Sequence, residues 1–143
     1  MTLPDGIALT LAVEPDPATV EALGEALSSF NEAAAGPSGS CPLWIIARDA
    51  EGRLAGGLRG QTFWHWLFVA WLWVDEARRG QGLGAALLRA AEDEARRRDC
   101  IGAYVDTYSF QAPGFYARQG YAVFGRLDDL PPGGSRTWFA KRL

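Results

Sequence analysis

The sequence predicts an α/β protein with one mixed sheet and helices on both of its faces. Strand-like and helix-like hydrophobic patterns alternate along 143 residues, a length typical of a single domain spanning 1–143. The apolar run Trp66–Val74 has the composition of a strand that is buried in the middle of a sheet. A loop with three glycines follows at residues 79–84 and leads into an amphipathic helical pattern.

Each further element is predicted from hydrophobic spacing. Residues 7–13 alternate apolar with small or polar side chains, as a strand does, and residues 18–34 carry apolar side chains at helical spacing. The remaining predictions are strands at 43–48, 54–61, 63–74, 101–108, 121–126 and 136–143, and helices at 82–98 and 113–119.

A cluster of charges ends the helix predicted at 82–98. Acidic and basic residues stand there four positions apart, in the order that stabilises a helix. We therefore expect three exposed ion pairs, Glu92–Arg96, Asp93–Arg97 and Glu94–Arg98.

The composition limits the partners of the protein. A net charge of −3 without a dense basic face argues against nucleic acid as a partner. The longest apolar run is too short to cross a membrane, and the first residues lack a signal-peptide pattern. We expect a cytoplasmic protein with no membrane partner and no bound metal, in which Cys41 and Cys100 are reduced.

The glycine loop predicts a site for a pyrophosphate. Glycines let the backbone approach phosphate oxygens without obstruction by a Cβ atom. The N–H groups of the following first helical turn point at the anion, and an arginine supplies full positive charge. The loop reads Arg79, Gly80, Gln81, Gly82, Leu83 and Gly84, with Arg78 before it.

Two known phosphate-binding loops fit this segment less well. A P-loop needs a lysine after its spacer, and the chain has no lysine before Lys141. The dinucleotide fingerprint fits formally at Gly80, Gly82 and Ala85, but it normally opens a fold of several strand–helix repeats. A nicotinamide-dependent enzyme is therefore an alternative that binding of NAD(P)H would test.

Two spaced motifs resemble those of the Gcn5-related N-acetyltransferase (GNAT) superfamily. Its loop motif is Arg/Gln-x-x-Gly-x-Gly/Ala, which Arg79, Gly82 and Gly84 match. Its second motif is Asn-x-x-Ala-x-x-Phe/Leu-Tyr-x-x-x-Gly-Phe/Tyr. The residues at those spacings are Ser109, Ala112, Phe115, Tyr116, Gly120 and Tyr121, so a serine replaces the usual asparagine.

The resemblance implies a single, mostly antiparallel sheet of about seven strands, the acyl-CoA N-acyltransferase fold. It also implies acetyl-CoA as the cofactor, bound where the sheet splays between its fourth and fifth strands, here 66–74 and 101–108. The pantetheine arm is expected to pair with backbone near the end of the first of these strands. The residues implied for coenzyme binding are Leu72, Trp73, Val74, Arg79, Gly80, Gln81, Gly82, Leu83, Gly84, Ala85 and Ser109.

Tyr116 and Asp106 are the candidate catalytic residues. By resemblance, Tyr116 donates a proton to the leaving thiolate; otherwise it packs beside Phe115 and Tyr121. Asp106 is a carboxylate in an otherwise apolar strand, where burial is expected to raise its pKa. It contacts a cationic acceptor, takes the amine proton directly or through water, or makes structural hydrogen bonds.

An aromatic cluster supplies the candidates for binding the acceptor. Trp64, His65 and Trp66 are expected to line the acceptor pocket together with Asp106. Two alternatives remain, since such rings also form cores and homodimer interfaces. His65, the only histidine, is an alternative general base.

These features predict transfer of an acetyl group from acetyl-CoA to a primary amine, directly in a ternary complex. The acidic protein favours a small cationic acceptor, such as a polyamine or an aminoglycoside-like antibiotic. Residues 106–112 are similar to a bacterial subgroup with antibiotic-modifying members. The alternatives are a protein or peptide amine as acceptor, and a non-catalytic module that binds or senses coenzyme A.

Overall fold

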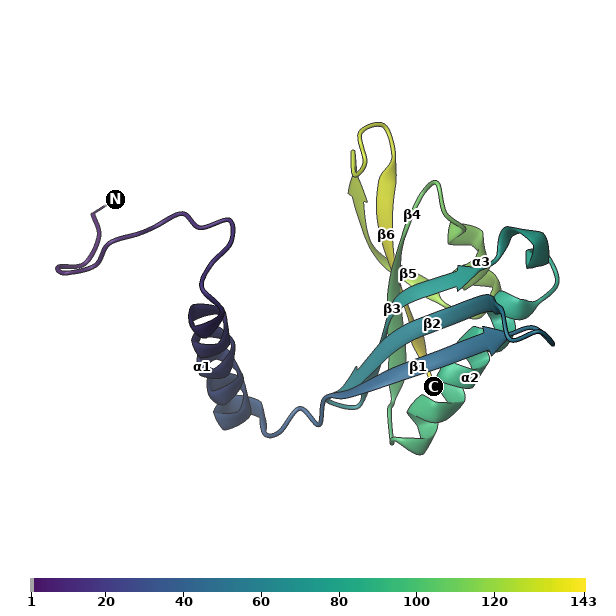
Figure 1. Ribbon diagram of the computed structural model, residues 1–143, viewed down its shortest axis with the longest axis horizontal. Coiled ribbons are helices and arrows are strands. Elements are labelled where there is room, and N and C mark those ends of the chain that lie inside the picture. Colours follow the sequence, from purple (N-terminus) through teal and green to yellow (C-terminus); the bar gives the residue numbers. More distant parts are fainter. Residues whose placement is uncertain (1) are drawn as a thin grey trace. The chain divides into compact units, whose positions relative to one another are not determined.

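The computed structural model describes residues 2–143 as two units, one that ends at Ser38 and one that spans Gly39–Leu143 (Figure 1). In the first unit, helix α1 (Pro17–Ala35) confirms the predicted helix. Pro17 stands in its first turn, and Gly36 ends it with a φ of 81°.

The strand predicted at 7–13 is wrong. These residues have no strand structure, and their apolar side chains Leu9 and Leu11 are exposed. An alternation of apolar and polar residues indicates only which side chains favour burial. A strand also needs a neighbour for its N–H and C=O groups, and the pattern does not supply one.

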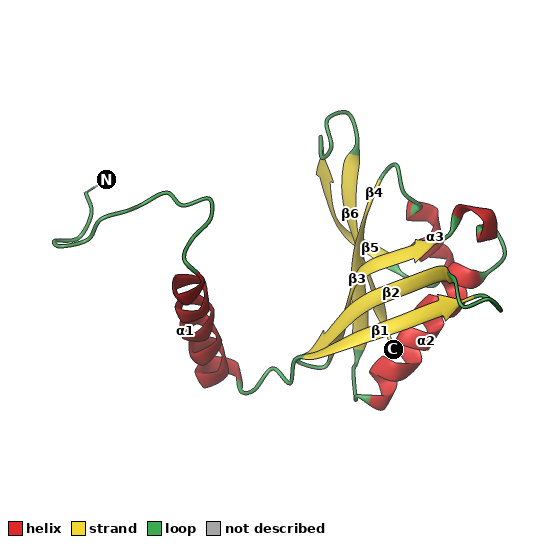
Figure 2. Ribbon diagram, viewed as in Figure 1, coloured by secondary structure: helices red, strands yellow, loops and turns green. Residues whose placement is uncertain are grey.

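The second unit is built on a six-stranded sheet with the order β1-β2-β3-β4-β6-β5 (Figure 2). Only β3 and β4 run parallel, so the sheet is mixed and mostly antiparallel, as predicted. The strands are β1 (Cys41–Arg48), β2 (Leu54–Phe63), β3 (Trp66–Val74), β4 (Gly102–Tyr108), β5 (Ala122–Asp128) and β6 (Ser135–Arg142). The helices are the short 3-10 turn η1 (Glu76–Arg78), α2 (Leu83–Arg97) and α3 (Pro113–Arg118).

The segment 63–74, predicted as one strand, is divided by a tight turn. Phe63 ends β2, Trp66 begins β3, and these two residues pair across the hairpin. Trp64 and His65 form the turn with positive φ values of 43° and 62°. Two-residue hairpin turns need this left-handed backbone, which two bulky residues do not signal in a sequence.

One face of the sheet is covered by α2, which packs against β1, β2 and β3. Its buried side chains Leu87, Leu88 and Ala91 meet alternate strand residues such as Leu67 and Val69. Tyr116 of α3 belongs to the same core. Helices α2 and α3 therefore share the core side of the sheet, whereas α1 belongs to the other unit.

The predicted pairs Glu92–Arg96 and Asp93–Arg97 are wrong. The side chain of Glu92 is only 3% exposed and accepts hydrogen bonds from Lys141 Nζ at 3.0 and 3.1 Å and from the Tyr121 hydroxyl at 2.8 Å. Arg96 binds Asp93, Arg97 binds Glu94, and only Glu94–Arg98 forms as predicted.

Candidate active site

The sheet opens between β3 and β4, which confirms the predicted splay. The two strands pair from Trp66 opposite Gly102 to Val69 opposite Val105, and their pairing stops there. A bulge at Ala70 coincides with this point, because Val69 pairs with Gly60 while Trp71 pairs with Arg59. The second half of β3 therefore turns a row of backbone groups toward the opening rather than toward β4.

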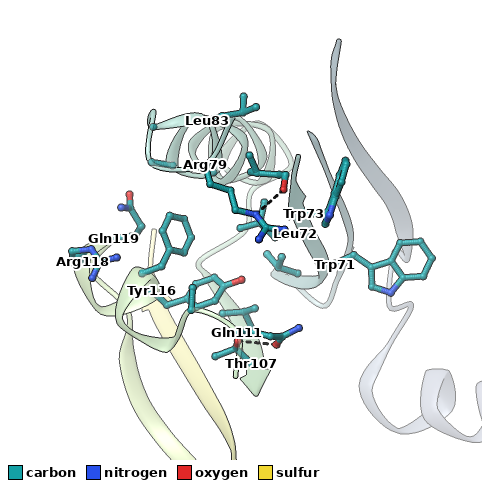
Figure 3. A pocket seen from close by; sticks show the side chains of 18 of the residues that line it. Trp71, Leu72, Trp73, Arg79, Leu83, Thr107, Gln111, Tyr116, Arg118 and Gln119 are labelled. Carbon is teal, nitrogen blue, oxygen red and sulfur yellow. Dashed lines mark hydrogen bonds between the residues drawn. The ribbon is translucent and has the colours of Figure 1, made fainter. Parts of the chain in front are cut away.

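A cavity of about 980 Å³ occupies this opening (Figure 3). One wall comes from Ala70 to Val74 of β3, and another from residues 105–107 of β4. Arg79 reaches in from the loop before α2, while Tyr116 of α3 turns its hydroxyl toward the middle of the space. The implied coenzyme residues among its lining are Leu72, Trp73, Val74, Arg79, Gly80, Gly82, Leu83, Gly84 and Ala85.

The loop at one end of the cavity has the backbone that an anion site needs. Gly80 and Gly82 have φ values of 73° and 85°, and an added Cβ would meet nothing within 4 Å at either position. Helix α2 begins after Gly82 without a side-chain cap, so the N–H groups of its first turn remain available to an anion. Arg79 Nε donates to the Val74 carbonyl oxygen at 3.1 Å, which holds this side chain at the cavity.

Tyr116 is a buried phenol at the wall of the cavity. Its ring packs against Phe139 and Tyr121, with ring centroids 5.7 and 5.9 Å away. Burial, with a smaller contribution from the charge of Asp106, raises the pKa of Tyr116 to about 12. The phenol is therefore protonated at neutral pH and able to donate a hydrogen bond.

Asp106 also lines the cavity, but it has a partner that the sequence did not indicate. Arg136 of β6 donates to Asp106 Oδ1 from Nη2 at 2.6 Å and from Nε at 2.8 Å. The guanidinium also lies over the rings of Tyr108 and Trp138, 5.4 and 5.0 Å from their centroids. The isolated buried carboxylate expected from the sequence is in fact an ion-paired one.

Five of the predicted site residues lie outside the lining of the cavity. Gln81 donates to the Ala77 carbonyl, and the Ser109 hydroxyl accepts from the Ser135 N–H at 3.0 Å. Trp64 and His65 form the turn that begins β3, at the opposite end of the strand from the glycine loop.

His65 Nδ1 lies 3.0 Å from the Asp99 carbonyl oxygen. The Trp66 ring lies close against Gly102, where an added Cβ would approach it to 2.5 Å. Both side chains therefore have packing or backbone partners of their own.

The structure adds residues that sequence reasoning missed. Thr107 and the Tyr108 N–H both donate to Gln111 Oε1, at 2.9 and 2.8 Å, which fixes the loop between β4 and α3 at the cavity. Arg136 has no signal in the sequence, because nothing there shows that the last strand lies beside β4.

Known proteins agree with the fold. The model of the acetyltransferase (GNAT) family matches residues 10–121. A blasticidin-S acetyltransferase of Streptomyces morookaense is 50% identical over 106 aligned residues, and the match covers 71% of this chain and 78% of that protein.

Two crystal structures are also similar. One, assigned as an acetyltransferase from Agrobacterium tumefaciens, has a TM-score of 0.88 at 39% identity and covers 96% of this chain and 100% of that one. Nourseothricin acetyltransferase has a TM-score of 0.63 at 25% identity, covering 71% and 65%.

The chain belongs to the acetyltransferase (GNAT) family and is an N-acetyltransferase. Enzymes of this family use acetyl-CoA as the acetyl donor. Among residues 2–143, no helix is both long and apolar enough to span a membrane.

Proposed function

We propose that this protein transfers the acetyl group of acetyl-CoA to a primary amine of a small cationic molecule, and that antibiotics are its first candidate acceptors. One observation carries the proposal: a protonated phenol, Tyr116, and a carboxylate, Asp106, line the same cavity, which ends at a glycine loop and the uncapped first turn of α2. The similar enzymes are named for blasticidin S and nourseothricin, which supports an antibiotic amine.

The coenzyme would lie along the second half of β3. Its pyrophosphate would meet the first-turn N–H groups of α2 and the guanidinium of Arg79, and its pantetheine arm would pair with backbone at residues 72–74. The acetyl group would then lie near the bulge at Ala70, between Tyr116 and Asp106.

Asp106 and Tyr116 have separate tasks in this proposal. The carboxylate attracts the cationic acceptor and helps to remove the amine proton, directly or through water. The neutral amine attacks the thioester carbonyl, the C–S bond breaks, and the thiolate takes a proton from the Tyr116 hydroxyl. Water then returns a proton to Tyr116. Because acceptor and coenzyme react directly, no acetyl-enzyme forms.

Release of free thiol from acetyl-CoA, measured with a panel of amines, tests this function. The panel contains blasticidin S, nourseothricin, a polyamine, an aminoglycoside and a peptide with a free N-terminus and a lysine. Thiol release with a small cationic amine, with mass spectrometry showing one added acetyl group on it, is the expected result. Release with the peptide alone would identify a protein or peptide acetyltransferase instead.

Tight coenzyme binding without release for any amine would favour the non-catalytic sensor. Initial-rate patterns that intersect support the ternary complex, whereas parallel lines would indicate a covalent intermediate. We also infer a cytoplasmic location, where acetyl-CoA is available, and no role for nucleic acid; fractionation of producing cells tests the location.

A further inference from the structure

The glycine loop is tied to a distant part of the sheet by one buried carboxylate. Asp49 directly follows β1 and begins the turn to β2, and its Oδ2 accepts a hydrogen bond from Arg78 Nη2 at 3.1 Å. Arg78 is the last residue of η1, directly before the loop that begins at Arg79, and it lines the coenzyme cavity. The contact therefore joins the β1–β2 turn to the loop across 29 positions of sequence.

Asp49 is itself held in a fixed orientation. Its Oδ1 accepts from the backbone N–H groups of Glu51 and Arg53, each at 2.9 Å, and Arg53 Nε donates to Oδ2 at 3.1 Å. These hydrogen bonds lower the pKa of Asp49, and the bond from the Arg53 N–H makes the largest contribution. Its side chain is 7% exposed, whereas that of Arg53 is 74% exposed. Asp49 is thus a rigid anionic anchor rather than a mobile surface acid.

On this side the backbone before the loop makes a hydrogen bond to the sheet, from the Asp75 N–H to the Ala55 carbonyl oxygen of β2 at 2.9 Å. A recess of about 410 Å³ lies between the loop and the sheet, with Ala47 and Ala55 on one wall and Gly82 and Leu83 on the other. Arg79 binds the carbonyl of Val74 at the end of β3, and Gln81 binds that of Ala77 within the segment itself. Among the side-chain hydrogen bonds of residues 2–143, the one from Arg78 to Asp49 joins segment 76–82 to the β1–β2 turn.

We propose that Asp49 is a positioning residue for the coenzyme, which acts through Arg78 to hold the glycine loop in the shape that receives the pyrophosphate. This inference rests on the proposed coenzyme site. Two glycines with positive φ give the loop many alternative conformations. Without the Arg78–Asp49 contact the loop would sample these conformations, and ordering it when coenzyme binds would cost free energy. Loss of the Asp49 carboxylate therefore weakens the binding of acetyl-CoA and leaves the chemical step unchanged.

Titration calorimetry with coenzyme A and steady-state kinetics on the full chain test the proposal. Asp49→Asn keeps an oxygen for the turn but loses the charge that holds Arg78. We expect about tenfold weaker coenzyme binding and a similar rise in KM for acetyl-CoA, with kcat and the KM for the amine unchanged. Asp49→Glu restores part of the affinity. Arg53→Gln is the matched control. It removes the other, exposed cation of the same carboxylate, but the backbone N–H groups of Glu51 and Arg53 still hold Asp49, so the coenzyme affinity should stay unchanged.

A double-mutant cycle separates positioning from a general loss of structure. If Asp49 acts through Arg78, Asp49→Asn has no further effect in an Arg78→Gln background. Additive losses in the cycle, or unchanged or tighter binding by Asp49→Asn, would overturn the inference. Tighter binding would mean that Asp49 merely neutralises Arg78. If the wild-type protein does not bind coenzyme A, the proposed function fails instead, so the two failures are distinguishable.

Discussion

Tyr116 and Asp106 approach one cavity from opposite faces of β4. Tyr116 packs against Phe139, which pairs with Val105 and lies on the same face of the sheet. Side chains alternate along a strand, so Asp106 points to the other face. The negative charge of Asp106 nevertheless contributes to the raised pKa of Tyr116. In the proposed mechanism, the amine would enter on one face of the sheet while the thiolate takes its proton on the other.

Tyr116→Phe should lower turnover at least tenfold with little change in coenzyme affinity. The phenol is the donor proposed for the leaving sulfur, and general-acid steps contribute on the order of 10²–10⁴ in rate. Thiol release and calorimetry with coenzyme A measure the two quantities. Tyr108→Phe is the control, because Tyr108 contacts Phe110 and Arg136 through its ring. Unchanged turnover in Tyr116→Phe would remove the tyrosine from the mechanism.

The dependence of kcat on pH should lack an alkaline decline below about pH 11. Burial and Asp106 raise the pKa of Tyr116 from 10 to about 12, so the phenol keeps its proton through this range. The rate should rise with pH as the amine loses its proton and then level off. A descending limb between about pH 8 and 10 that disappears in Tyr116→Phe would contradict the high pKa of this group.

Asp106→Asn should raise KM for a cationic amine about tenfold or more, with little effect on the coenzyme affinity. The change removes the anion that attracts the acceptor and leaves Arg136, formerly its partner at 2.6 Å, as an unpaired cation. Steady-state kinetics with amines of different charge measure the effect, which should be smallest for an amine without a second cation. Asp129→Asn in the β5–β6 turn serves as the control. Equal losses for charged and uncharged amines would argue for a structural role of Asp106.

Glu92→Gln should destabilise the protein by about 2–3 kcal/mol. Glu92 is nearly fully buried, and the change leaves Lys141, 3.0 Å away, without its charged partner. Lys141 is 24% exposed, so solvent reduces the loss below that of a fully buried pair. Urea unfolding measures the free energy. Asp93→Asn, which removes an exposed pair with Arg96, should cost less than about 1 kcal/mol. Equal effects of the two changes would contradict the structural role of Glu92.

Local patterns predicted most of the second unit. The helix after the glycine loop begins at Leu83, and the short helix that carries Tyr116 begins at Pro113, as their glycine and proline signals indicate. The order of these elements was sufficient to predict a mixed sheet, whereas its opening was implied by the resemblance to the GNAT superfamily. The pattern failed at Trp64 and His65, because a left-handed turn in two bulky residues depends on the register of the flanking strands.

The structure brings together those predicted site residues that are close in sequence, and not those whose position depends on strand pairing. The residues of the loop and of β3 that were predicted to bind coenzyme line one cavity. Trp64, His65 and Trp66 precede them on the same strand, yet they lie at its other end. The aromatic cluster showed that these side chains favour burial, and it contained no information on which end of the strand faces the acceptor.

The amino-acid sequence alone determined the glycine loop, the helix behind it and the spacing that brings Tyr116 to the core, because each depends on neighbours along the chain. Only the tertiary structure decided that Asp106 binds Arg136, that Glu92 binds Lys141 and that Asp49 binds Arg78. The physical reason is the strand order: β6 inserts between β4 and β5, and a side chain's partner across strands depends on that order and on the register.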